Sequence, residues 1–166
     1  MPLVDSLDMR GRLIIRTRNR QDAVVEEITA DNAIVYTGRE LVAYLFTGQP
    51  HTVSITPISH LALGSDGTAV HPKAEDTALK AEALRLPIGK MDIQKAQDDS
   101  TARAKVTITT ELDFAVPSDR DSLELREAGL FNGEDRETSV MYNRVVFPVI
   151  TKTKEFALTF IWEITF

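Results

Sequence analysis

The sequence predicts an α+β domain that is mostly antiparallel β, a β-sandwich-like meander with one or two short helices. Three observations lead to this class. Polar and apolar residues alternate along several segments of the second half, as in strands with one buried face. One segment of the first half carries signals for both ends of a helix. The length of 166 residues, with 43% hydrophobic and 27% charged residues, suits a single domain over 1–166.

The strands of the second half follow from this alternation. The clearest segment runs from 156 to 166, where every second residue is large and apolar: Phe156, Leu158, Phe160, Trp162, Ile164 and Phe166. A second segment alternates over 106–116 and ends at Pro117. A third, over 140–149, is apolar on both faces near its centre, as in a strand covered on both sides. With a strand over 122–131 and a turn over 132–135, these segments predict an antiparallel meander of about four strands.

The first half is predicted to mix elements. A strand is expected around 13–17, with Arg16 and Arg18 on its solvent side. Thr37 and Glu40 resemble a capping box and Gly48 a C-cap, which predicts a helix from about Thr37 to Thr47. Short strands are expected over 53–55 and 58–63, a second short helix over 76–84, and a polar loop over 89–101.

Composition excludes several classes of protein. The chain has no cysteine, so disulfides, thiolate metal sites and thiol nucleophiles are absent, as suits a reducing cytoplasm. Its apolar runs are far shorter than the ~20 residues that span a bilayer, and its first residues lack a signal-peptide pattern, so neither a membrane nor secretion is expected. A net charge of −6 argues against binding to nucleic acid.

The charge is unevenly distributed along the chain. Residues 1–20 contain five arginines and two aspartates, a net charge of +3, whereas the remaining residues carry −9. We therefore distinguish a basic N-terminal strand or arm over 1–30 from a body over 31–166. The candidate interface comprises Arg12, Arg16, Arg18 and Arg20. No aromatic residue interleaves with them, so a protein-facing or solvated edge strand is favoured over a nucleic-acid platform.

Motifs of common enzymes are missing from the sequence. The glycines form neither a dinucleotide fingerprint nor a P-loop, and no nucleophile elbow occurs. The three histidines, His51, His60 and His71, are spaced by nine and eleven residues, which places no two imidazoles on one face of a single element. A three-histidine site assembled by the fold is the remaining metal hypothesis. No cofactor is predicted.

Four glutamates on expected regular elements are formal candidates for acid–base chemistry: Glu82, Glu111, Glu124 and Glu127. Glu127 stands out because it precedes the apolar run from Ala128 to Phe131. An acid in such surroundings favours a buried, hydrogen-bonded structural role over a catalytic one. A hydrolase with paired carboxylates therefore ranks below the non-enzymatic hypotheses.

Five short motifs occur in a fixed order between 32 and 166. They are Leu61-Ala62-Leu63-Gly64, Thr77-Ala78-Leu79-x-x-Glu82-x-x-Arg85, Glu127-Ala128-Gly129-Leu130-Phe131-Asn132, Phe147-Pro148-x-Ile150-x-Lys152-Thr153 and the long strand with Trp162. This order resembles phage tail-fibre and tail-collar attachment domains and their short baseplate or neck relatives. Fibre proteins usually continue into a repetitive shaft, whereas this chain ends at Phe166, so an adaptor or ring subunit is expected.

The resemblance implies a non-enzymatic virion component of the tail region, made in the host cytoplasm. Its partners would be itself, as a trimer, hexamer or larger ring, and other tail proteins. The motif residues Glu127, Gly129, Leu130, Phe131, Glu82 and Arg85 would hold the attachment module in shape, with Gly129 at a bulge or close approach and Glu82 beside Arg85 on a helical turn. The alternative is a β-sandwich module that binds carbohydrate or peptide.

Overall fold

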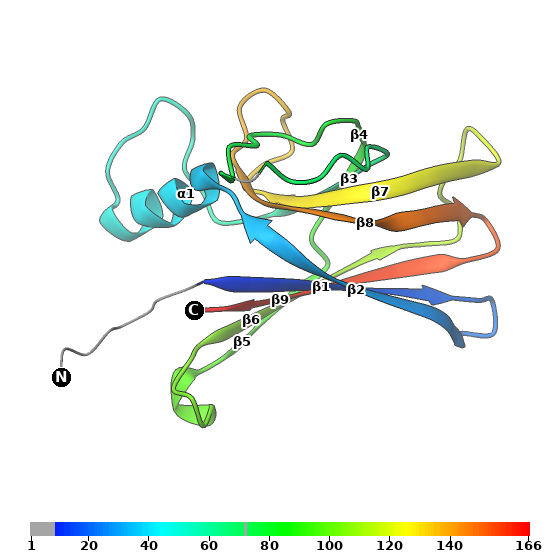
Figure 1. Cartoon of the computed structure of the whole chain (residues 1–166), viewed down its shortest axis with the longest axis horizontal. Coiled ribbons are helices and arrows are strands. Elements are labelled where there is room, and N and C mark those ends of the chain that lie inside the picture. Colours follow the sequence, from blue (N-terminus) through cyan, green and yellow to red (C-terminus); the bar gives the residue numbers. More distant parts are fainter. Residues whose placement is uncertain (1–8, 72) are drawn as a thin grey trace.

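The computed structural model describes residues 9–71 and 73–166, which form nine strands, one α-helix and one short 3-10 helix (Figure 1). In chain order the elements are β1 (Arg10–Arg18), β2 (Val24–Ile34), α1 (Tyr36–Thr47), β3 (His60–Gly64), β4 (Glu82–Pro87), β5 (Lys90–Gln94), η1 (Ala96–Asp98), β6 (Lys105–Leu112), β7 (Ser122–Phe131), β8 (Met141–Thr153) and β9 (Ala157–Thr165). No helix in these two ranges is long and apolar enough to span a membrane.

The strands form one sheet in the order β4-β3-β7-β8-β2-β1-β9-β6-β5, and every neighbouring pair is antiparallel. Four pairs of strands that follow each other along the chain form hairpins: β1 with β2, β3 with β4, β5 with β6, and β7 with β8. The predicted meander of β6, β7, β8 and β9 is wrong at both ends. Only β7 and β8 pair as predicted, because β6 pairs with β5 and β9 instead of β7, and β2 and β1 lie between β8 and β9. Alternation reveals the buried face of a strand but carries no information about its neighbours.

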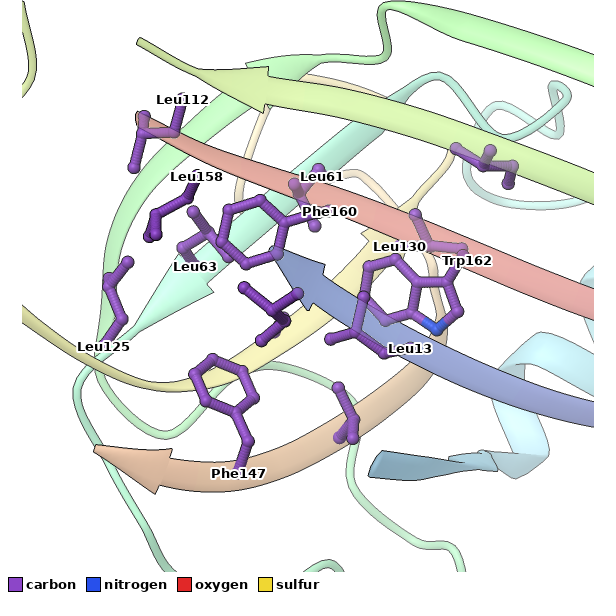
Figure 2. Packing of buried hydrophobic residues seen from close by; sticks show 14 of the residues in the cluster. Leu13, Leu61, Leu63, Leu112, Leu125, Leu130, Phe147, Leu158, Phe160 and Trp162 are labelled. Carbon is purple, nitrogen blue, oxygen red and sulfur yellow. The ribbon is translucent and has the colours of Figure 1, made fainter. Parts of the chain in front are cut away.

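The sheet curls so that its two ends face each other. We call β5, β6, β9, β1 and β2 the first half-sheet, and β8, β7, β3 and β4 the second half-sheet. They join where β2 pairs with β8 through Ala33 and Ile34. Their inner faces share one apolar core (Figure 2), to which the first half-sheet contributes Leu13, Phe160 and Trp162 and the second contributes Leu63 and Leu130. Each large side chain buried here contributes about 1.5–3 kcal/mol.

Several predicted strands match the structure. β7 begins and ends at the predicted residues, and the alternation in β9 buries Leu158, Phe160, Trp162 and Ile164. Phe166 follows β9 and is 37% exposed, so the alternation predicted the buried face but not how far the core extends. β8 is longer than predicted, since it continues to Thr153.

The α+β class itself is wrong, because the described residues form a largely antiparallel β fold with a single α-helix. The predicted second helix over 76–84 is a loop that leads into β4, where pairing with β3 outweighs local helix propensity. The predicted loop over 89–101 contains β5 and η1. Residues 53–55 form no strand, and β3 begins at His60 rather than at 58.

The helix α1 begins one residue before its predicted start, at Tyr36 instead of Thr37, and ends at Thr47 as predicted. No capping box forms, because the Thr37 hydroxyl donates to the Met141 carbonyl of β8 instead, at 2.8 Å. Gly48 takes the left-handed conformation with φ of 63°, and its amide donates to the Tyr44 carbonyl. A Cβ at Gly38 would lie 2.0 Å from the Tyr142 carbonyl oxygen, so a glycine is needed for α1 to pack this closely on β8.

Candidate functional site

The second half-sheet contains a buried ion-pair cluster. Glu127 on β7 and Arg144 on β8 are both 0% exposed, and the Arg144 Nε lies 2.9 Å from the Glu127 Oε2. Arg144 Nη1 also lies 3.4 Å from Oδ2 of Asp76, whose side chain is almost fully buried. Lys80 Nζ completes the cluster at 2.9 Å from Asp76 Oδ1. Buried charges of this kind are tolerated only when paired and hydrogen-bonded.

The cluster fastens the long connection between β3 and β4. The Glu127 carboxylate accepts the backbone N–H groups of Lys80 at 3.1 Å and Ala81 at 2.7 Å. Arg144 donates to the Thr68 carbonyl at 3.0 Å, and Asp76 accepts the backbone N–H of His71 at 2.9 Å. Both Glu127 oxygens are therefore occupied by groups of the chain itself, which is the geometry of a structural carboxylate.

The contacts of Asp76 change its affinity for a proton. Burial opposes its ionisation, but the hydrogen bond from the His71 amide and the cations of Lys80 and Arg144 outweigh burial. The pKa of Asp76 is consequently held below its usual value. Asp76 therefore remains an anion at neutral pH, which suits a fixed ion pair rather than a general acid.

A second cluster joins β4 to the connection between β7 and β8. Arg85 binds Glu82 with two hydrogen bonds, from Nε at 2.9 Å and from Nη2 at 2.7 Å. Its Nη1 donates to the Gly133 carbonyl at 3.0 Å and the Ser139 hydroxyl at 2.6 Å. The guanidinium also lies over the Phe131 ring, 3.9 Å from its centroid.

The predicted helical turn for Glu82 and Arg85 is wrong, since both residues lie on β4. Residues three apart on a regular strand point to opposite faces. Here the register shifts between Leu63 and Gly64 of β3, which adds one residue to β4 and returns the two side chains to the same face.

The remaining motif residues pack around these clusters. A Cβ at Gly129 would lie 2.8 Å from the Asn143 carbonyl oxygen, so Gly129 stands at a close approach between β7 and β8. Leu130 is fully buried, and its amide donates to the Asn143 side chain at 3.0 Å. Phe131 is buried beneath Arg85, next to a shift in the β7–β8 register that adds one residue to β8. All three residues act in internal packing.

Arg12, Arg16 and Arg18 lie on an interior strand, because β1 is paired with both β2 and β9, whereas Arg20 lies in the turn between β1 and β2. The predicted edge position is therefore wrong. Arg12 pairs with Glu163, and Arg16 with Glu27 at 2.7 Å. Arg18 pairs with Asp22 and Glu111, and Arg20 lies 3.7 Å from Glu155. We call these exposed pairs on the outer face of the first half-sheet the charge ladder.

The charge ladder is largely neutral as a whole. Lys105 and Arg12 both contact Glu163, and their hydrogen bonds lower the pKa of that carboxyl against the opposing effect of its partial burial. A partner that bound these arginines would have to displace carboxylates of the same chain.

The four glutamates considered for acid–base chemistry have separate partners. Glu127 and Glu82 belong to the two clusters above, Glu111 pairs with Arg18, and Glu124 lies 3.8 Å from Arg126. Acid–base catalysis by a carboxylate pair needs both groups to face one substrate. The contacts of these residues describe four ion pairs instead.

The histidines also lie apart. His51 contacts the Tyr44 ring at 4.5 Å between centroids, His60 contacts Ser59, and His71 lies 3.7 Å from Glu75. No group of three histidine, aspartate or glutamate residues that could hold a metal ion occurs within 9–71 and 73–166.

Sequence reasoning missed two buried cations on β8, Arg144 and Lys152. Lys152 donates to the Thr153 carbonyl at 2.7 Å and to the Val116 carbonyl, and burial lowers its pKa. Arg144 and Lys152 are the charged residues of β8, whose other residues from Met141 to Thr153 are uncharged. A charged residue inside such a strand was the available signal, because it must find buried partners.

Apolar side chains are exposed on β5, where Met91 is 44% and Ile93 73% exposed, and at two further surfaces. The last turn of α1 projects past the sheet (Figure 1), and there Phe46 is 92% and Leu45 41% exposed. A cleft of about 340 Å³ opens where β2 and β8 diverge, lined by Val25, Glu26, Val149, Phe156 and Leu158 among others.

Comparison with known proteins returned no match to a family model, a curated protein or a solved structure.

Proposed function

We propose that the protein is a non-enzymatic structural subunit of a bacteriophage or phage-like tail, baseplate, collar or neck. It acts as an oligomeric attachment or adaptor protein. The exposed apolar surface of α1 supports the proposal that the protein is an assembly subunit. The order of the five sequence motifs, which resembles that of tail attachment domains, supports the proposal that the assembly is a tail.

The exposed end of α1 is the observation that carries the proposal. Leu41 is buried against the body and Val42 is half-buried, and the same apolar stripe continues into Leu45 and Phe46 beyond the sheet. A phenylalanine that is covered gains about 1.5–3 kcal/mol over one left in water. A neighbouring subunit that covers this turn would obtain that stabilisation.

The charged residues support a structural role as well. The buried cluster of Glu127, Arg144 and Asp76 binds backbone groups of the β3–β4 connection, and Arg85 binds the connection between β7 and β8. These contacts hold the long β3–β4 and β7–β8 connections against the sheet, so that they form one body with it. Rigid bodies with a few uncovered apolar side chains suit repeated assembly, where symmetry multiplies each contact.

The first experiment measures absolute mass by light scattering after size-exclusion chromatography, over a range of protein concentrations. We expect a defined oligomer, and electron microscopy of that fraction should show a ring. The Phe46→Ser variant should shift the mass towards the monomer without changing the circular dichroism spectrum. Gln49→Ser is the matched control, since it alters an exposed polar neighbour just after α1.

Two results would contradict parts of the proposal. A strict monomer that binds glycans on an array, with binding lost in Phe46→Ser, would favour the carbohydrate-binding module. An oligomer that is absent from purified tail particles by mass spectrometry would leave an assembly subunit of another machine.

A further inference from the structure

The strand β2 has an uncovered edge. One side of β2 pairs with β1 from Val24 to Asn32, while among the described residues its other side pairs with β8 only at Ala33 and Ile34. The segment from 24 to 31 therefore presents backbone groups that no described strand pairs. Long open edges of this kind recruit another strand unless they are protected.

The alternation of backbone hydrogen bonds identifies which amides and carbonyls of β2 face its open edge. The amide of Val35 donates to the Tyr142 carbonyl of β8, at 3.2 Å. In an antiparallel strand, alternate residues direct both backbone groups to the same side. The amides and carbonyls of Glu27, Thr29 and Asp31 hence face the open edge, whereas those of Ile28 and Ala30 face β1.

The cleft beside this edge is lined by apolar side chains, by two threonines and by one carboxylate. The cleft next to it is lined by Val25, Val149, Phe156 and Leu158, and Val25 and Val149 are about half-exposed. Glu26 also lines the cleft and, within the described residues, takes part in no ion pair. The facing strand β8 contains Pro148, which has no amide N–H, so β2 offers the more complete set of backbone donors.

We propose that the open edge of β2 binds an extended segment of a partner protein as an added strand. The segment carries apolar side chains at alternate positions, which enter the cleft, and a lysine or arginine that pairs with Glu26. This inference deepens the proposed function, since it names the kind of partner an attachment protein would hold. Strand addition supplies affinity through the backbone and specificity through alternate side chains.

A second copy of this chain is the poorer occupant of the edge. β2 contains three acidic residues, Glu26, Glu27 and Asp31, and no basic residue. Two β2 strands paired across a two-fold axis would bring these acids together, and like charges across a strand pair are destabilising. A basic partner segment has the complementary charge.

Hydrogen exchange of the full chain, followed by nuclear magnetic resonance, tests the proposal. The probe is a seven-residue peptide, blocked at both ends, that alternates valine with threonine and carries one lysine in the valine phase. In the free protein we expect fast exchange at Glu27, Thr29 and Asp31 and slow exchange at Ile28 and Ala30. Peptide at ten times its dissociation constant should slow the three outward amides about tenfold.

Variants assign the effect to the edge. Thr29→Pro removes an outward N–H but none of the bonds to β1, so it should reduce peptide binding at least about tenfold, whereas Thr29→Ala should bind normally. Glu26→Gln keeps the backbone edge intact. It should abolish the preference for the lysine peptide over one with glutamate in its place.

Three outcomes would overturn the inference. These are equal exchange of odd and even amides in the free protein at every concentration, protection that rises with protein concentration alone, and no slowing with millimolar peptide. None of them depends on the α1 surface, so a chain that still oligomerises through Phe46 would retain the proposed function while losing the added strand.

Discussion

Both half-sheets contain Arg–Glu ion pairs, but the pairs differ in their burial and in what they hold in place. On the second half-sheet, Arg144 and Glu127 are fully buried and bind a connection into place. On the first, Arg16 and Glu27 form an equally short pair, yet their side chains are 44% and 47% exposed. Burial of the two side chains, and the backbone groups that they also bind, therefore decide how much an ion pair stabilises the fold, rather than the distance between the charges.

The physical reason lies in the cost of leaving a charge behind. Removing one partner of a buried pair leaves an uncompensated charge in the interior, which costs about 3–5 kcal/mol. Removing one partner of an exposed pair lets water replace it, at a cost of about 0–1 kcal/mol. Three experiments test this contrast, in order of expected effect.

The largest effect is expected for Glu127→Gln. The variant leaves Arg144 buried with Asp76 as its nearest charge and weakens the acceptor of the Lys80 and Ala81 amides. The free energy of unfolding in urea should fall by about 3–5 kcal/mol.

The double variant Glu127→Gln with Arg144→Met serves as its control. Because both charges are gone, the double variant should lose less than the sum of the two single losses. Additive losses, or a loss below about 1 kcal/mol for Glu127→Gln alone, would contradict a coupled buried cluster.

An intermediate effect is expected from the pH dependence of Asp76. Its pKa in the folded state is lower than the ordinary 3.8, so its stabilisation is complete above 3.8 and is lost as the pH falls through the lowered folded value. Asp76→Asn should cost about 1.5–3 kcal/mol at pH 7.

The urea midpoint measured from pH 7 to pH 3 checks this sign. The curves of the variant and the original protein should converge towards low pH. Glu163→Gln, which removes another carboxylate of lowered pKa from the exposed ladder, is the comparison. A constant gap between Asp76→Asn and the original protein at all pH values would refute the linkage.

The smallest effect is expected for Arg16→Gln. The pair with Glu27 is half-exposed, so the free energy of unfolding should change by less than about 1 kcal/mol, and the change should shrink in 1 M salt.

If the arginine series also serves as an interface, reversing the charge of Arg16 and Arg18 should lower the oligomer mass while the fold persists. An unchanged mass would remove the series from the interface.

Local sequence patterns predicted the elements whose structure depends on local chemistry. The alternation in β9 predicted which of its residues are buried, and Gly48 marked the end of α1. Glu127 stood out because an acid next to an apolar run needs internal partners. These features are encoded within a few neighbouring residues.

The rest depends on contacts between distant residues. The segment over 76–81 is fixed by a residue that is distant in sequence, since the amides of Lys80 and Ala81 donate to Glu127, 46 residues from Ala81. The position of β1 in the sheet depends on β9, so the arginines gained partners such as Glu163 that lie 151 residues away. A single sequence carries no signal for such pairings, and the predicted meander order was wrong for the same reason.

The insertion of β9 between β1 and β6 has a consequence for the speed of folding. Four hairpins can form from neighbouring residues, but Arg10 meets Thr165 only when most of the chain is brought together. Folding rates fall as contacts connect more distant residues, because loop-closure entropy is lost before those contacts form. We therefore expect the hairpins to form early and β9 to pair with β1 and β6 late. Until then β1 of the first hairpin and β6 of the third each have an unpaired edge that another chain can bind. A chaperone, or a low concentration of nascent chains, would therefore raise the yield of native protein.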